Sequence, residues 1–208
     1  MIETEAGPEK YSFVGGWLCL DFTNTVSSYG NGYPNERFEG YADVVEWGRK
    51  ASVLSDGQAR GLLEAADRRP EEAASVFQRA LALREAIHWI FSSISDDTSP
   101  GSADLDTLNA ELSRGMAHSR IVATEHGFEW GWADEEEALD RVLWPVARSA
   151  ADLLTSEELD RVRECAGNTC GWLFVDMSRN HSRHWCDMRD CGNRAKVRRY
   201  YQRKKSAR

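Results

Sequence analysis

The chain has 208 residues, of which 41% are apolar, and it contains eight tryptophans, a composition typical of folded globular proteins rather than disordered ones. Its net charge is −8, and no window approaches about 18 consecutive apolar residues, so we expect no membrane span and no membrane association. The sequence MIETEAGPEK at the N-terminus is acidic where a signal peptide is basic, so a cytoplasmic location is expected.

The charge is distributed unevenly along the chain. Residues 161–208 contain 13 Lys or Arg and 4 Asp or Glu, which gives a net charge of +9. Residues 1–160 contain 13 Lys or Arg and 30 Asp or Glu, which gives a net charge of −17. A change of sign along one chain indicates two modules with different roles. We therefore predict an acidic domain over 1–160 and a basic domain over 161–208.

In chain order, the first apolar segment covers residues 11–26 and fits two kinds of structure. Leu18, Leu20 and Phe22 alternate as in a strand, whereas Leu18, Phe22 and Val26 fall on one face of a helix. Periodicity leaves both interpretations open here.

The next segments are predicted to be a loop over 27–40, which is rich in Gly, Asn and Pro, and a helix over 41–54. The strongest helical pattern covers residues 70–95, where Pro70 and the acids that follow it suit a first turn. Its apolar residues recur at alternating steps of four and three and form one stripe. They are Val76, Ala80, Leu83, Ile87, Ile90 and Ile94.

A shorter helix is predicted over 105–115, with Gly115 as its stop, and a β-hairpin over 119–133. The pattern over 134–154 is helical again, and Pro145 is expected to kink or divide this helix.

Thr155 and Glu158 have the spacing of a capping box, which predicts a short helix leading into the basic region. Together these elements predict an α+β chain. Its N-terminal domain is mainly helical with a short β-hairpin. A small basic domain follows and is expected to end in a basic helix.

Four of the five cysteines lie in the basic region as two pairs with four residues between the members, Cys165 with Cys170 and Cys186 with Cys191. A glycine follows each pair, and it permits the positive φ that such turns often need. Four thiolates satisfy a tetrahedral Zn²⁺ and leave no open position, so we predict structural rather than catalytic zinc. The second domain is therefore predicted to be a small four-cysteine zinc finger of treble-clef or ribbon type. The alternatives are disulfides, which need an oxidising compartment, and buried free thiols. The remaining Cys19 is expected in the core.

The segment after Cys191 is predicted to form a helix to about Lys205. A basic helix on a folded scaffold is a common means of contacting DNA. The predicted nucleic-acid contacts are Arg194, Lys196, Arg198, Arg199, Arg203 and Lys204. Val197, Tyr200 and Tyr201 are expected to pack against the zinc module. A solubilising tail, or a tail that docks on the acidic domain, is the alternative.

Three polar residues stand in apolar stretches of the acidic domain: Asp21, Asn24 and Arg84. They either line a pocket for a small-molecule effector or make buried structural hydrogen bonds. The sequence shows no catalytic constellation, so we do not expect an enzyme.

The stretch from Cys170 to Lys205 resembles the CGNR zinc finger, whose namesake tetrapeptide is Cys191-Gly192-Asn193-Arg194. His184 stands where the pattern leads us to expect an arginine. The other shared positions are Phe174, Asp176, Ser178, Arg179, Asn180, Arg183, Trp185 and Met188.

The segment GGWLCLDFTNT resembles the opening of the ABATE domain that accompanies this finger. LREAIHWIF and the helix containing Trp144 also fit that domain. The resemblance implies a stress-induced transcription regulator with a DNA-binding finger and no established enzyme activity. The acidic domain is then expected to sense a ligand or to form a homodimer. An interaction module that docks on the transcription machinery or another acidic partner, without touching DNA, is the alternative function.

Overall fold

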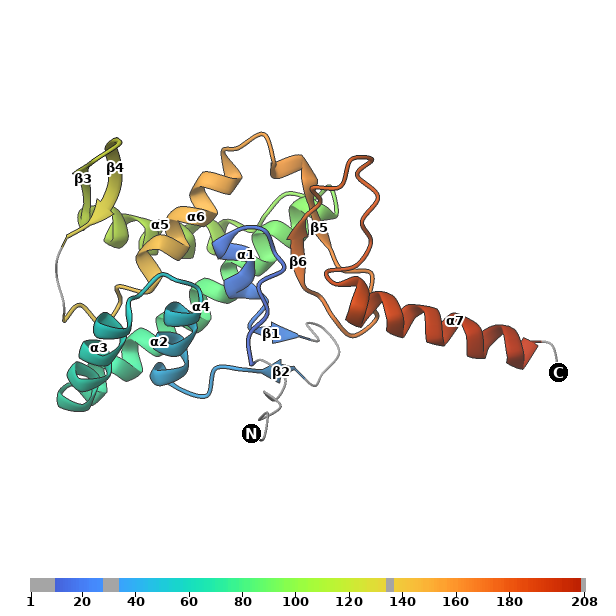
Figure 1. Ribbon diagram of the computed structural model, residues 1–208, viewed down its shortest axis with the longest axis horizontal. Coiled ribbons are helices and arrows are strands. Elements are labelled where there is room, and N and C mark those ends of the chain that lie inside the picture. The colour runs from blue at the N-terminus through green and yellow to red at the C-terminus, as the bar shows by residue number, and fades with distance from the viewer. Residues whose placement is uncertain (1–9, 28–33, 134–136, 207–208) are drawn as a thin grey trace.

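The computed structural model describes residues 10–27, 34–133 and 137–206 (Figure 1). Seven helices and three two-stranded antiparallel sheets are found within these ranges. The helices are α1 (Leu18–Thr23), α2 (Tyr41–Lys50), α3 (Asp56–Arg68), α4 (Pro70–Ser95), α5 (Ser102–Ala117), α6 (Leu143–Leu154) and α7 (Asn193–Ser206). The sheets pair β1 (Val26–Ser27) with β2 (Asn35–Glu36), β3 (Ser119–Thr124) with β4 (Gly127–Trp132), and β5 (Val162–Glu164) with β6 (Leu173–Val175). The predicted class, a mainly helical domain followed by a small four-cysteine unit that ends in a helix, is confirmed.

Helix α4 is the centre of the helical part and contacts α1, α2, α3, α5 and α6 as well as both strands β5 and β6. Its bounds agree with the predicted 70–95, and Pro70 stands at its first position, where the missing N–H costs no hydrogen bond. The predicted apolar stripe is buried from Val76 to Ile90, with Ile94 partly buried.

The N-terminal apolar segment is helical, which resolves the ambiguity of its periodicity. Cys19, Leu20 and Phe22 of α1 are fully buried against the core, and Cys19 is the core cysteine that was predicted. The predicted loop over 27–40 contains the two short strands β1 and β2, and its residues 28–33 lie outside the described part of the chain.

Helix α3 was not predicted, although its start carries a capping box. The Ser55 hydroxyl accepts a hydrogen bond from the Gln58 amide at 3.2 Å, and the Gln58 side chain accepts one from the Ser55 amide at 2.9 Å. These two bonds satisfy amides that lack partners within the helix.

The kink predicted at Pro145 is absent because α6 begins only at Leu143. Pro145 therefore stands in the first turn, where its missing N–H has no helical partner to lose. The acids of the predicted helix at residues 134–136 lie outside the described residues. Helix α5 likewise differs from its prediction, since it continues past the buried Gly115 to Ala117.

The capping box predicted at Thr155 and Glu158 is also absent. The Thr155 hydroxyl donates to the carbonyl of Ala151 at 3.0 Å, so this residue closes α6 rather than opening a new helix. A single 3-10 turn over Leu159–Arg161 follows.

The hairpin predicted over 119–133 is confirmed as β3 and β4, with Ile121 opposite Trp130 and Ala123 opposite Phe128. It extends from the helical part (Figure 1), and Phe128 and Trp130 keep 81% and 55% of their surface exposed.

Strands β5 and β6 connect the helical part with the cysteine region. Val162, Leu173 and Val175 are buried in the same core as the helices. The Ser92 hydroxyl of α4 donates to the Glu164 carboxylate at 2.7 Å, and the Glu164 amide donates to the Ser95 hydroxyl at 3.1 Å. The start of the zinc-finger region is therefore fixed to α4. The division at residue 160 stays a prediction.

Helix α7 projects away from the rest of the molecule, and only its first turns lie near the other elements (Figure 1). In the described ranges, no helix combines the length and the apolar character that crossing a membrane requires.

Candidate metal centre

The four predicted ligands Cys165, Cys170, Cys186 and Cys191 come together as one buried cluster. Their sulfur atoms all lie within 4.8 Å of one another, and the Sγ of Cys186 is 3.6 Å from that of Cys170 and 3.7 Å from that of Cys191. Zn–S bonds of about 2.3 Å in a tetrahedron place sulfur atoms about 3.8 Å apart, so the spacing fits zinc. Four soft donors close the coordination shell, and the chain carries a structural zinc site.

Short backbone elements bring the sulfurs together. Cys165 directly follows β5 and its amide donates to the Trp172 carbonyl at 2.8 Å, while Cys170 lies in the turn that leads into β6, so the antiparallel strands bring the two residues close together. Cys186 precedes a tight π-type turn over Met188–Gly192, and Cys191 lies within this turn.

The two glycines that follow the cysteine pairs differ in role. Gly171 has φ +70°, the left-handed conformation predicted for it. Gly192 is instead buried within the turn and donates its amide to the Asp187 carbonyl at 3.0 Å. A third glycine, Gly167, was not predicted to matter, yet it lies so close to the cluster that a Cβ atom there would be 3.3 Å from the Sγ of Cys191.

Two donors point at the sulfur atoms. The Cys186 amide donates to the Sγ of Cys165 at 3.3 Å, and the Arg194 guanidinium donates to the Sγ of Cys191 at 3.0 Å. The thiols also lie within hydrogen-bonding distance of one another. The pKa of Cys165 is lowered, first because the Cys170 thiol donates a hydrogen bond to it, and the same contact raises the pKa of Cys170. A bound zinc ion would take the place of the thiol protons, and the Cys186 amide and the Arg194 guanidinium would stabilise the resulting thiolates.

The loop between the two pairs is held by a buried carboxylate. Asp176 accepts hydrogen bonds from the amides of Ser178 and Arg183, both at 2.9 Å. Burial raises the pKa of Asp176, but hydrogen bonds from the Ser178 side chain and from these two amides outweigh it and keep the pKa below its ordinary value. The Arg183 guanidinium lies 4.2 Å from the Phe174 ring and donates to the Trp185 carbonyl at 3.0 Å. Positions shared with the CGNR pattern thus shape the loop.

The two histidines near the cysteines stand outside the metal cluster. His181 has its Nδ1 3.4 Å from the Asp176 carbonyl, and the exposed His184 packs edge-on against Trp185 with the ring centres 5.7 Å apart.

The predicted nucleic-acid contacts all lie on α7, and their side chains are exposed. Arg194 also forms an ion pair with Asp190 at 3.0 Å, in addition to its hydrogen bond to the Cys191 sulfur. The expectation that Val197, Tyr200 and Tyr201 pack on the zinc module is wrong: they are 54%, 61% and 65% exposed. The helix leaves the module after its first turns, so these apolar side chains remain largely in solvent.

The three residues proposed for a ligand pocket all bond to groups of the chain itself. Asp21 accepts a hydrogen bond from the Gly15 amide at 2.8 Å, and burial raises its pKa to about 6 although backbone hydrogen bonds oppose the shift. Asn24 bonds to the backbone of Leu173. Arg84 is buried and pairs with Glu36 at 2.7 Å. These bonds describe structural roles, and the ligand pocket stays a prediction.

Comparison with known families agrees with this geometry. Residues 16–157 match the ABATE family, described as "Putative stress-induced transcription regulator". Residues 161–204 match the CGNR zinc finger. No curated protein matches the chain. The ABATE match covers more than half of the sequence, and the four-cysteine cluster lies where the finger is matched. The chain therefore belongs to the ABATE family and carries a CGNR zinc finger after the ABATE domain.

Proposed function

We propose that this regulator binds DNA through α7, with the zinc cluster fixing the start of the helix. The observation that supports the proposal is the free projection of α7 from the molecule (Figure 1). The helix contains no acidic residue, and its basic residues are Arg194, Lys196, Arg198, Arg199, Arg203, Lys204 and Lys205.

The dimensions and charge of α7 suit a DNA groove. Fourteen residues at 1.5 Å each make a helix about 21 Å long, and the major groove of B-DNA admits an α-helix. Helix α7 packs on the Met188–Gly192 turn that precedes it and points away from the acidic helical domain, so its cations are available to a polyanion (Figure 1). The exposed Tyr200 and Tyr201 add groups that can contact bases or sugars.

Zinc has an orienting role in this proposal. Cys191 belongs to the turn that runs directly into α7, and Arg194 in the first turn of the helix donates to its sulfur. The metal therefore sets the direction in which α7 leaves the molecule, while the exposed cations beyond Arg194 make the contacts.

The helical domain is proposed to sense an effector or to mediate homodimerisation. The exposed apolar side chains Ile121, Phe128 and Trp130 on the β3–β4 hairpin support a contact surface there. Sedimentation of the purified protein over a range of concentrations tests dimerisation, and a monomer at all concentrations contradicts it.

The proposed DNA binding is tested with fluorescently labelled genomic fragments at two salt concentrations. Each phosphate neutralised contributes about 0.9 to the slope of log affinity against log salt. The double variant Arg198→Gln, Arg203→Gln is expected to weaken binding at least tenfold and to reduce the slope by about two such contributions. The matched control is Arg60→Gln, Arg120→Gln, which removes two exposed cations from the acidic domain.

Equal binding by the two double variants, or binding that does not change with salt, contradicts the proposal. Capture of a protein partner by α7 after nuclease treatment, without any DNA binding, favours the interaction module instead.

A further inference from the structure

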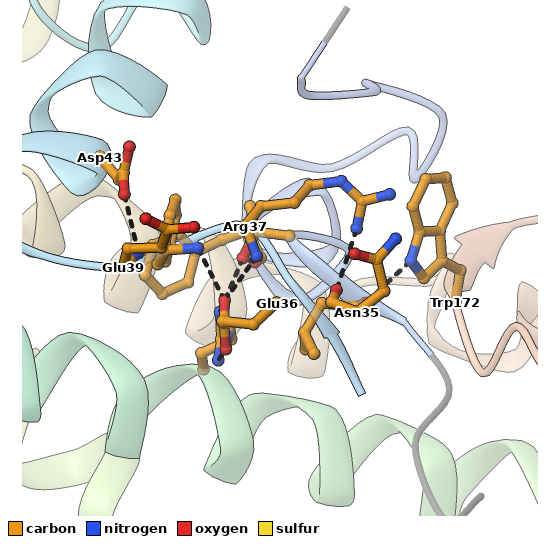
Figure 2. Close-up of polar contacts among 11 residues, drawn as sticks. Asn35, Glu36, Arg37, Glu39, Asp43 and Trp172 are labelled. Atoms are coloured by element: carbon orange, nitrogen blue, oxygen red, sulfur yellow. Dashed lines mark hydrogen bonds and ion pairs between the residues drawn. The ribbon is translucent and has the colours of Figure 1, made fainter. Parts of the chain in front are cut away.

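Arg37, just beyond β2, lies at the junction between the helical domain and the zinc region. Its side chain runs from β2 toward Trp172, and the guanidinium lies 5.2 Å from the centre of the indole ring (Figure 2). Trp172 is fixed in turn, because its Nε1 donates to the Val26 carbonyl at 2.8 Å. The cation–π contact with a fixed indole therefore restrains the guanidinium before any ligand arrives.

The charge of Arg37 has no anionic partner among the described residues. The adjacent carboxylate of Glu36 points away and is used by Arg84 and by the amides of Arg37 and Phe38 (Figure 2). Within the described ranges, the Arg37 guanidinium makes a single hydrogen bond, to the Asn35 carbonyl at 3.4 Å, although the group carries five N–H donors. Burial lowers the pKa of Arg37, but a guanidinium remains charged at neutral pH.

The guanidinium borders a polar cavity of about 310 Å³. A water molecule takes about 30 Å³ of liquid volume, so this space accommodates a phosphate group together with several waters. The side chains around it are mostly hydrogen-bonding groups from both modules. They are Ser27, Asn35, Arg37, Thr169, Trp172, Asp190 and Arg194, with Cys170 at the base.

Arg194 reaches the same cavity from the first turn of α7, but its charge is shared with Asp190 and with the Cys191 sulfur. Arg37 is thus the cation of the cavity that an external anion can pair with. Arg194 and Arg198, one helical turn apart, also line a smaller neighbouring cavity together with Thr169. Thr169 and Arg194 line both cavities, so the cavity at Arg37 lies beside the first turns of α7.

We propose that Arg37 and the cavity beside it bind a backbone phosphate of the nucleic acid that contacts α7. The helical domain then takes a direct part in nucleic-acid binding, and the bound strand extends from α7 across the zinc region to β2. This inference rests on the proposed function of α7. Arginine is suited to the role because its planar N–H donors bind phosphate in pairs.

The test compares Arg37→Gln, Arg37→Lys and Arg60→Gln with the wild type in DNA-binding titrations between 50 and 200 mM salt, about the range in which phosphate contacts dominate. Arg37→Gln is expected to reduce the salt slope by about 0.9, the contribution of one phosphate, and to weaken binding about tenfold at the lower salt. Arg37→Lys keeps the slope but loses several-fold in affinity, because an ammonium lacks the paired donors and the planar stacking on Trp172. Arg60→Gln removes an exposed cation from α3 and leaves both quantities unchanged.

Zinc content and thermal unfolding show whether each variant is folded. If Arg37→Gln is unstable, the several-fold loss of affinity expected for Arg37→Lys tests the inference in its place. If Arg37→Gln binds like Arg60→Gln while the α7 double variant loses binding, this inference is wrong and the proposed function stands. If the wild type binds no DNA even at low salt, both are wrong.

Discussion

The side chain of Asn24 makes both of its hydrogen bonds to the backbone of Leu173, donating to its carbonyl and accepting from its amide, each at 2.9 Å. All the groups involved are buried. The Asn24 side chain thus makes the pair of backbone hydrogen bonds that a neighbouring strand would make to β6. The two residues are 149 positions apart in sequence. The pair joins the first helix of the ABATE domain to the zinc-finger region.

The first prediction concerns this pair. Asn24→Ala leaves a buried amide and a buried carbonyl of Leu173 without partners, and each such group costs about 1–3 kcal/mol. We expect the free energy of unfolding in urea to fall by about 3 kcal/mol. Asn109→Ala, an exposed change on α5, serves as the matched control. A loss no larger than that of the control contradicts the structural role of Asn24.

The second prediction concerns the metal. Elemental analysis of the purified protein is expected to give one zinc per chain, and Cys186→Ser is expected to lose it, whereas Cys19→Ala retains it because Cys19 lies in the helical core. Since β5 and β6 pack on α4, removal of zinc by a chelator should lower the melting temperature of the helical domain as well. Unchanged unfolding of the helices after chelation would show that the two parts are energetically independent.

The third prediction concerns the ion pair between Arg84 and Glu36. Arg84 is only 3% exposed, whereas the Glu36 side chain is 35% exposed. Glu36→Gln leaves the buried guanidinium without its countercharge. We expect a loss of about 2 kcal/mol, less than the ~3–5 kcal/mol of a fully buried pair because water reaches Glu36. The exposed Glu39→Gln provides the control, and equal stability of the two variants in urea refutes the prediction.

The fourth prediction concerns pH. Burial lowers the pKa of His88 on α4 from 6.5 to about 4, and the charge of Arg84 adds to this effect. Between these values the unfolded chain takes up a proton that the folded chain does not, so stability present above pH 6.5 is lost as the pH falls toward 4. The loss amounts to about 3 kcal/mol.

Substituting His88→Gln should therefore remove this loss, so that the unfolding free energy of the variant rises relative to that of the wild type as the pH falls from 7 to 4, the range that the pKa shift defines. The exposed His126→Gln is the control and should retain the wild-type profile. Parallel profiles for all three proteins would show that His88 is not the group responsible.

Two features were predictable because the sequence signals them locally. The stripe of α4 and the proline at its first position defined a helix that the structure reproduces from Pro70 to Ser95. The paired cysteines with their glycines defined the metal cluster, because ligand chemistry limits the arrangements of four thiolates.

Other features depend on tertiary context. The start of α6 could not be located by periodicity, so Pro145 was placed inside the helix rather than in its first turn. The capping box at Ser55 could have predicted the start of α3. The buried face of this helix consists of Ala59, Leu62 and Ala65, however, and two alanines and one leucine form only a weak apolar pattern. The apolar positions of α7 fit a packed face in sequence, and only the structure shows that these side chains remain exposed.

Arg37 illustrates the limit of sequence reasoning about the site. It stands alone in a polar loop, and nothing in its neighbours distinguishes it from other surface arginines. Its contact with the Trp172 ring depends on the folding of β6, which directly follows Trp172 and lies more than 130 positions away in the sequence.

The packing of β6 into the helical core has a consequence for the exchange of fingers between relatives. A chimaera that takes its finger from another chain at residue 161 also replaces Val162, Leu173 and Val175, which complete the hydrophobic core of the ABATE domain. A compatible graft must keep these residues together with the Leu173 backbone position that Asn24 recognises, and exchange only the cysteine loop between β5 and β6 and the chain beyond β6. The structural boundary between the modules therefore lies after the strands β5 and β6 have joined the helical core, and not at residue 161.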